Sequence, residues 1–136
     1  MGELKTRRCD RADAKVRLGH AYGFLEAATL FHGEQDQHAA NVAASNAVHA
    51  AIAAADAACC AALGCHAQGQ DHHQAGDLLA TVNPGGPTAA KALVRALAVK
   101  NNAAYGLTAL STKDRDSAIR QAEKLIAFAQ EIVDRG

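Results

Sequence analysis

Large aromatic side chains are nearly missing from this sequence. Only 4% of the 136 residues are aromatic, and tryptophan is absent. This scarcity excludes a core built on large rings. Alanine is the commonest residue, and it combines the highest intrinsic helix propensity with a side chain small enough for helix backbones to approach closely. Proline is also rare, with only Pro84 and Pro87, so little interrupts long helices.

An excess of charge of either sign is missing as well. The formal net charge is +0, and the isoelectric point is about 7.0. A balanced chain has no whole-domain electrostatic attraction for nucleic acid, although a local basic patch is compatible with it. The length of 136 residues fits a single domain with a modest core. We expect a loosely ordered N-terminal arm over residues 1–11.

No targeting or membrane-spanning segment is expected. The first residues, MGELKTRRCDRADAK, are charged and contain no apolar core segment of the signal-peptide kind. The alanine-rich run over residues 42–63 contains Ser45, Asn46, His49 and Asp56, which make it too polar for a membrane span. We therefore predict a cytoplasmic protein that does not enter a membrane.

The four cysteines are Cys9, Cys59, Cys60 and Cys65. Without a secretion signal, we expect them to be free thiols in a reducing cytoplasm. The cysteines and histidines between residues 59 and 73 carry atoms that bind zinc. However, no Cys-x-x-Cys or His-x-x-x-His spacing occurs among them. We predict no metal site and no cofactor.

Five helical segments are predicted, and no segment shows the alternating pattern of a strand. Their ranges are 12–31, 37–63, 72–82, 88–105 and 111–133. The sequence contains no internal repeat. The prediction is an all-α protein, an up-and-down four-helix bundle with one additional short helix.

The helix boundaries come from glycine, proline and capping residues. Gly33 and Gly64 are predicted stops for the first and second helices. Asp71 and Ser111 are predicted N-caps, because each is followed three residues later by Gln or Asp. The segment NPGGPT, residues 83–88, separates the third helix from the fourth.

The bulky apolar residues of the long helices are the predicted core, since they recur at helical spacing. They are Val16, Leu18, Tyr22, Leu25, Leu30 and Phe31 in the first helix; Val48, Ile52, Cys59 and Leu63 in the second; Leu93, Val94 and Leu97 in the fourth; and Ile119, Leu125, Ile126, Phe128, Ile132 and Val133 in the last.

Two consecutive histidines, His72 and His73, begin the predicted third helix. A helix N-terminus presents unpaired N–H groups and the positive end of its dipole, which attract phosphate. The same field disfavours the imidazolium and helps His72 to act as a base. The alternative is a pair of exposed histidines at a loop-to-helix corner.

A polar stripe runs along the second helix. Ser45, His49 and Asp56 share one face, because they are separated by four and seven residues. A buried Asp needs a partner, and an Asp56–His72 contact would orient the imidazole and raise its basicity. The alternative is that this stripe is simply the solvated face of the helix.

The segment VRALAVKNNAAYG contains Arg95, Lys100 and Tyr105. Arg95 and Lys100 form either a small basic edge or ordinary solvated charges. The nearby NPGGPT segment lacks the Lys-Ser/Thr of a phosphate-binding P-loop, so it is interpreted as a turn.

Four stretches, taken in order, resemble a known family. They are NAVHAAIAAADAACCAALG, GQDHHQAGDLL, AKALVRALAVKNNAAYG and STKDRDSAIRQAEKLIAFAQ, which lie within residues 37–133. This set is similar to a small actinobacterial-type branch of the HEPN superfamily. The resemblance implies a four-helix up-and-down bundle, usually dimeric. Many members are metal-independent ribonucleases, often the toxin of a toxin–antitoxin pair.

The family signature is an Arg followed, after four to six residues, by a His at the start of a helix. His72 matches the histidine, but the positions for the Arg hold Cys65, His66 and Ala67. In the implied mechanism, the His assists attack of the RNA 2′-hydroxyl on the adjacent phosphorus. The Arg neutralises charge on the phosphoryl oxygens. The chain therefore lacks the arginine of the signature, which is its permanent positive charge.

The first functional hypothesis is accordingly a HEPN-like RNA-directed nuclease. His72 would be the base, Asp56 its orienting carboxylate, and His66 or His73 an accessory cation. The expected RNA- or nucleotide-binding residues are Gln70, Asp71, His73, Lys100 and Tyr105.

A second hypothesis is a non-catalytic binding or assembly module for a nucleotide, an RNA or a protein. A third is a plain helical bundle that holds a metal or small ligand. The expected partners are a second copy of the chain, RNA or a nucleotide, and an antitoxin or nucleotidyltransferase.

Overall fold

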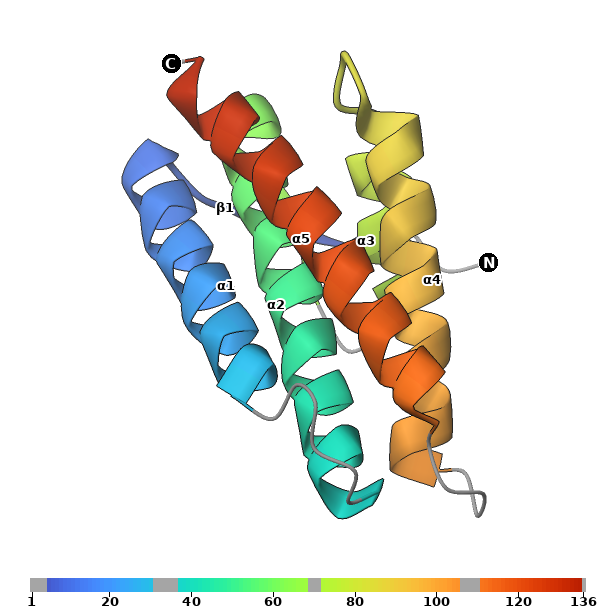
Figure 1. The fold of residues 1–136 in the computed structure, drawn as a ribbon. Helices are drawn as coiled ribbons and strands as arrows, with labels where there is room; N and C mark the ends of the chain where they lie inside the picture. The colour runs from blue at the N-terminus through green and yellow to red at the C-terminus, as the bar shows by residue number, and fades with distance from the viewer. Residues whose placement is uncertain (1–4, 31–36, 69–71, 106–110, 136) are drawn as a thin grey trace.

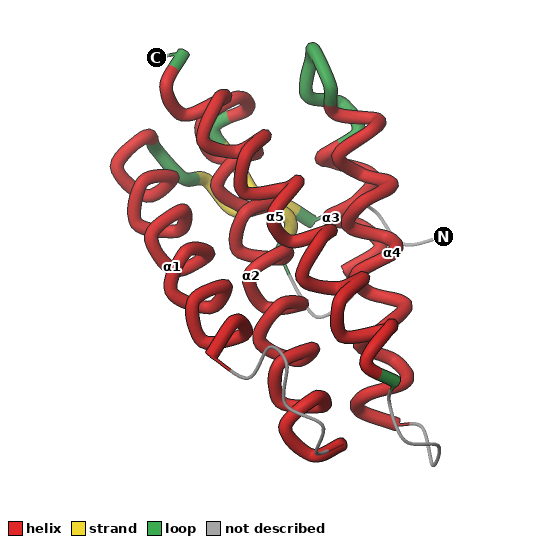
Figure 2. The backbone as a smooth tube through the Cα atoms, in the orientation of Figure 1, coloured by secondary structure: helices red, strands yellow, loops and turns green. Residues whose placement is uncertain are grey.

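The computed structural model describes residues 5–30, 37–68, 72–105 and 111–135. Its helices are α1 (Arg11–Leu30), α2 (Gln37–Leu63), α3 (His72–Leu79), α4 (Gly86–Tyr105) and α5 (Thr112–Asp134). The long helices α1, α2, α4 and α5 run up and down side by side, and the short α3 lies behind α4 (Figures 1 and 2). The predicted all-α bundle with one extra short helix is confirmed.

Helix α2 is the centre of this bundle, and it packs against α1, α4 and α5. Its alanines are almost completely buried, from Ala43 through Ala58. By length and composition, the stretch His38–Leu63 is apolar enough to cross a membrane, but most of it is buried inside the bundle. Composition alone therefore does not exclude a membrane span here, contrary to the sequence analysis, and it is the burial that marks α2 as the central helix of the bundle.

The buried face of α1 differs from the predicted one. The residues that α1 buries are Ala14, Leu18, Ala21 and Ala28. Of the bulky residues predicted to face the core, Val16 is 59% exposed and Leu30 is 74% exposed. The physical reason is that alanine lets α1 approach the neighbouring backbone closely, and dense packing at short distance outweighs the larger apolar area of valine or leucine.

The predicted boundaries agree well where they are described. Gly64 ends α2 with a φ of 73°, a left-handed conformation that favours glycine. Ser111 caps α5 in a complete capping box with Asp114. Helix α4 begins earlier than predicted, at Gly86, where a Cβ would lie 2.5 Å from the backbone oxygen of Leu79. Gly33 and Asp71 lie outside the described residues.

Two short strands, which the sequence analysis did not predict, cross the back of the bundle (Figure 2). Strand β1 (Thr6–Arg8) pairs antiparallel with β2 (Cys65–Ala67), and Arg7 lies opposite His66. Residues 5–11 are therefore not the loosely ordered arm that we expected, because β1 is held by backbone hydrogen bonds and leads directly into α1. Three-residue strands are too short to show an alternating pattern in a sequence.

The expectation of four free thiols is wrong for two of them. Cys9 and Cys60 form a disulfide that joins the end of the β1 segment to α2. Cys59 and Cys65 are free, with Cys59 buried and Cys65 partly exposed. The sequence could not reveal this pairing, because the two bonded residues are 51 positions apart and are brought together by the packing of α1 on α2 and the pairing of β1 with β2.

Enlarging a buried alanine of α1 tests the close-packed arrangement. We expect Ala21→Leu to lower the free energy of unfolding by about 1–3 kcal/mol, because a well-packed site has no room for three more carbon atoms. Ala12→Leu, at an exposed position of the same helix, is the matched control and should change the stability by less than about 0.5 kcal/mol. Urea unfolding followed by circular dichroism measures both. Equal urea midpoints would contradict the packing described here.

Candidate functional site

Asp56 is the only Asp, Glu, Lys or Arg between residues 37 and 63. It lies on α2, where its side chain is only 16% exposed. The Arg17 guanidinium on α1 donates to the Asp56 carboxylate from Nη2 at 3.3 Å and from Nε at 3.4 Å. The buried carboxylate therefore has the partner that burial requires, and that partner comes from a different helix.

The pKa of Asp56 reflects two opposing effects. Burial in the bundle raises it above the ordinary value of 3.8, and this is the larger effect. The positive charge of Arg17, the histidines His66 and His72, and the hydrogen bond from Arg17 all lower it. Asp56 is thus a carboxyl group whose ionisation depends on the cationic groups that surround it.

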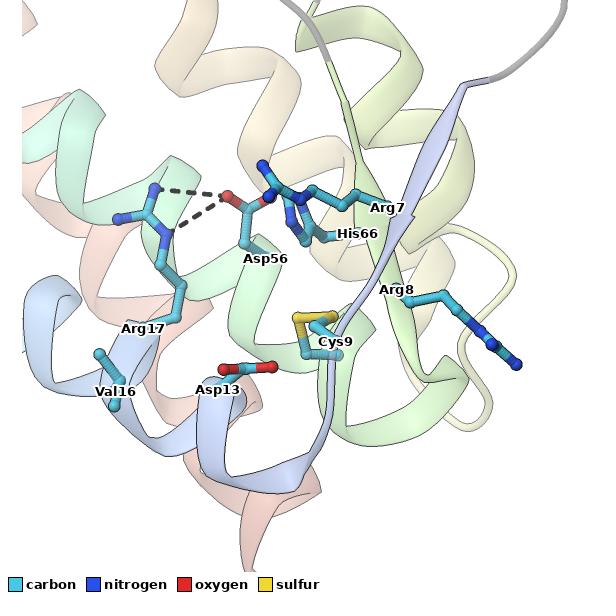
Figure 3. Close-up of a pocket in the computed structure, with 9 residues that line it drawn as sticks. Arg7, Arg8, Cys9, Asp13, Val16, Arg17, Asp56 and His66 are labelled. Carbon is cyan, nitrogen blue, oxygen red and sulfur yellow. Dashed lines mark hydrogen bonds and ion pairs between the residues drawn. A yellow bond between two sulfur atoms is a disulfide. The ribbon is translucent and has the colours of Figure 1, made fainter.

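The short β-ribbon places two more groups beside Asp56. Because Arg7 and His66 are direct partners across the strands, their side chains lie on the same face of the ribbon. Figure 3 shows Arg17 facing Asp56 from α1, with His66 and Arg7 on the other side of the carboxylate, whereas Arg8 points away. Residues from α1, α2, β1 and β2 therefore meet at one carboxylate.

The ring orientation of His66 is fixed by the backbone. Its Nδ1 lies 2.9 Å from the carbonyl oxygen of Ala67. A carbonyl oxygen can only accept, so Nδ1 carries the proton and donates. The other nitrogen, Nε2, is then the one that accepts a proton from a substrate or, in the imidazolium, donates one.

Two hollows share this group of residues. The first, called here the disulfide cavity, has a volume of about 390 Å³ and is lined by Arg7, Arg8, Cys9, Asp13, Val16, Arg17, Asp56, Cys60 and His66. The second, called the histidine cavity, has a volume of about 340 Å³ and is lined by Arg7, Arg17, Ile52, Asp56, His66, Ala67, Gln68, His72 and Ala75. Arg7, Arg17, Asp56 and His66 belong to both cavities.

The histidine cavity brings together the three residues that the sequence analysis named as catalytic. Asp56, His66 and His72 all line it. The Asp56 side chain accepts hydrogen bonds from Arg17, so this carboxylate holds a guanidinium as well as lining the cavity with His72. The polar stripe of α2 lies against α1, where the His49 ring also packs against Phe24 with ring centroids 5.4 Å apart.

Of the predicted nucleotide-binding residues, His73 is the one whose side chain the structure describes, and it lies away from this place. His73 lines a separate hollow of about 360 Å³ between α3 and α4, together with Lys91 and Arg95. Gln70 and Asp71 lie outside the described residues, and so do the side chains of Lys100 and Tyr105. The structure therefore separates the two neighbouring histidines, with His72 in the histidine cavity and His73 outside it.

Arg7 and Arg17 are the site residues that the sequence analysis missed. They supply two permanent positive charges to a cavity that contains one carboxylate, so the described lining is cationic even when both histidines are neutral. The family signature places its arginine within a few residues of His72, and neither Arg7 nor Arg17 is near His72 in sequence. The one available signal was Asp56 itself, since a charge on the central helix requires a cation from elsewhere in the chain.

A metal site does not emerge in the described part of the chain, where no group of three or more His, Cys, Asp or Glu side chains is arranged to hold an ion. The side chains of the histidine cavity supply a chemistry of their own. It combines two imidazoles for proton transfer, two guanidiniums for binding an anion, and one carboxylate that positions a guanidinium.

No protein-family model matches this sequence, and no curated protein matches it either. The likeness to the HEPN superfamily therefore rests on the residues quoted above.

Removing Arg17 tests the electrostatic pairing through its pH dependence. Because the pKa of Asp56 is raised above 3.8, the native state binds this proton more tightly than the unfolded chain. The contribution of Asp56 to the free energy of unfolding therefore falls as pH rises from 3.8 through the raised pKa. Arg17→Ala removes the largest effect that lowers this pKa, so it should cost about 1–3 kcal/mol at pH 7 and less toward pH 4, where more of Asp56 is protonated and the lost charge matters less.

Urea unfolding of wild type and Arg17→Ala between pH 4 and pH 8 measures this difference. Arg120→Ala, at an exposed position on α5, is the control and should behave like the wild type throughout. A loss of stability in Arg17→Ala that stays the same from pH 4 to pH 8 would show that the pairing with the Asp56 carboxylate is not its cause.

Proposed function

We propose that this protein binds RNA through its phosphate groups in the histidine cavity and cleaves it as a metal-independent endoribonuclease of the HEPN kind. One observation carries the proposal. A single solvent-accessible cavity is lined by two histidines, two arginines and the Asp56 carboxylate. This combination suits phosphodiester chemistry, which needs a base, an acid and fixed positive charge.

The reaction follows from these positions. The imidazole of His72 takes the proton of an RNA 2′-hydroxyl, and the oxygen attacks the adjacent phosphorus. The bond from phosphorus to the 5′-oxygen breaks, and the imidazolium of His66 gives that oxygen a proton from Nε2. The products are a 2′,3′-cyclic phosphate and a 5′-hydroxyl, with one proton taken up and one released.

The two arginines take the part that the family signature gives to its own arginine. Arg7 and Arg17 neutralise charge on the phosphoryl oxygens, which grows in the transition state. Asp56 is a positioning residue in this scheme, because it holds the Arg17 guanidinium from α2. What supports this assignment is that both guanidiniums line the same cavity as His66 and His72.

The wider setting belongs to the same proposal. The protein would be a cytoplasmic homodimer and would act in a toxin–antitoxin or defence system with an antitoxin or nucleotidyltransferase partner. The dimer, like the partner proteins, is taken from the resemblance to the HEPN superfamily. The alternative function is a non-catalytic module that binds RNA or a nucleotide in the same cavity.

Replacing His72 distinguishes the nuclease from the binding module. We expect His72→Ala to lower the rate of RNA cleavage at least about a hundredfold, because general acid–base catalysis contributes roughly 10²–10⁴ to a rate. The cleavage should continue in the presence of EDTA and leave 2′,3′-cyclic phosphate ends. Labelled single-stranded RNA, separated on denaturing gels, measures the rate and the ends.

His38→Ala is the matched control for this experiment. His38 lies 18 residues before Asp56 on the same helix, or ~27 Å at the rise of an α-helix, so its loss should leave the cleavage rate unchanged. Binding of RNA by the wild type without any cleavage would instead establish the non-catalytic module. An absence of both binding and cleavage would reject both functions.

A further inference from the structure

A disulfide forms part of the wall of the disulfide cavity, and the chemistry proposed above does not use it. Cys9 and Cys60 are bonded to each other, and both line this cavity with Arg7, Arg17 and Asp56. Cys60 follows Asp56 by four residues on α2, which places the two on the same face of the helix. The disulfide and the carboxylate are therefore neighbours on one wall.

The same disulfide anchors the strand that carries Arg7. Cys9 lies two residues after Arg7, at the end of the β1 segment. Besides the disulfide, this strand is held to the described residues of its neighbours by the three-residue ladder with β2 and by two flanking backbone hydrogen bonds, from Cys9 to Gly64 at 3.0 Å and from Gln68 to Lys5 at 2.9 Å. Isolated two-stranded ribbons are marginally stable in water. The covalent bond to α2 is thus the strongest link that holds Arg7 at the cavities.

We propose that the Cys9–Cys60 disulfide is a redox control on anion binding at this site. In the oxidised protein Arg7 is held in the wall of both cavities, and reduction releases the strand and removes that guanidinium. The inference rests on the proposed function in one respect, which is that the anion is a phosphate group of RNA.

The direction of the control follows from the shape of the site. Both cavities exist with β1 in place, and Arg7 contributes to the lining of each. The strand therefore forms a wall and supplies a charge, and it does not plug the site. Losing the strand removes one of the two guanidiniums that the cavities share, so reduction weakens binding.

The redox step is an ordinary thiol–disulfide exchange with an external dithiol. One thiolate of the dithiol attacks the sulfur of Cys9, which is the more exposed of the two bonded cysteines. The Cys9–Cys60 bond breaks, and the Cys60 sulfur leaves and takes a proton. The second thiol of the dithiol then displaces Cys9. The protein gains two electrons and two protons, and the dithiol loses them and becomes a disulfide.

Of the two remaining cysteines, Cys59 is too unreactive to replace this bond in the folded protein. Burial is the main cause that raises the pKa of the Cys59 thiol to about 12, so Cys59 is not a nucleophile at neutral pH. Cys65 is partly exposed on β2, opposite Arg8. Cys65 is therefore the residue whose substitution serves as a control.

The experiment measures RNA affinity in the oxidised and reduced forms of the full chain. The probe is a single-stranded RNA with methylated 2′-hydroxyls, which binds but cannot be cleaved. Reduction with dithiothreitol should weaken its binding about tenfold, the effect of losing one charge-assisted contact to phosphate. Thiol titration after denaturation should rise from the two free cysteines to all four. Circular dichroism should show an unchanged helical bundle.

Three variants make the assignment specific. Cys9→Ser should bind weakly in both conditions, because it cannot form the tether. Cys65→Ser should respond to reduction like the wild type. Arg7→Ala should bind in its oxidised form as weakly as the reduced wild type and should not respond further to reduction. An Arg7→Ala protein that still loses affinity on reduction would show that the disulfide acts through something other than Arg7.

Amide hydrogen exchange of residues 5–9 separates this inference from the proposed function. Faster exchange on reduction, with no RNA binding in either form, would support the release of the strand on reduction but would reject RNA as the ligand. Unchanged exchange and unchanged RNA affinity on reduction would overturn the redox control while leaving RNA binding intact. Four free thiols in protein prepared without reductant would overturn it as well.

Discussion

The pairing of Arg17 with Asp56 is the interaction around which this site is built. Helix α2 is enclosed by α1, α4 and α5 and is lined mainly with alanine, so a carboxylate on it has little access to water. An ionised group in such surroundings is tolerated only with a nearby opposite charge. Arg17 fulfils that requirement at 3.3 Å while remaining 33% exposed itself. The same guanidinium can therefore hold the carboxylate on one side and face an anion on the other.

Alanine makes this arrangement geometrically possible. A helix lined with leucine would hold α1 farther from α2, and the buried alanines of α1 instead let the two backbones approach closely. Arg17 lies within one turn of the buried Ala14, Leu18 and Ala21. Its long side chain can therefore reach across the seam to Asp56. The alanine-rich composition sets the short distance between α1 and α2, and that distance allows the Arg17–Asp56 ion pair to form.

The helices could be predicted from the sequence because each depends on local signals, such as the glycine at position 64, the capping box at Ser111 and the NPGGPT turn. The buried face of α1 could not be predicted. Hydrophobicity favours Val16 and Leu30 as the buried residues of this helix, whereas close packing of the backbones favours alanine. The grouping of Asp56, His66 and His72 could be predicted in part, because α2 ends just before the strand that carries His66. The roles of Arg7 and Arg17 and the Cys9–Cys60 disulfide could not be predicted, because each depends on contacts between segments far apart in the chain.

The site consists of one half on long helices and one half on short strands, and this division affects how accurately the reacting groups are positioned. Arg17 and Asp56 lie on long helices whose positions are fixed by the core, whereas Arg7 and His66 lie on strands of three residues. Proton transfer requires the heavy atoms to be within about 3 Å of each other, which a short and exposed ribbon does not guarantee. The hydrogen bond from His66 Nδ1 to the Ala67 carbonyl oxygen orients the imidazole, and the Cys9–Cys60 bond anchors the ribbon beside the cavities. The tethered half of the site, on the short strands, therefore carries the two residues, Arg7 and His66, that complete its positive charge and its acid–base pair.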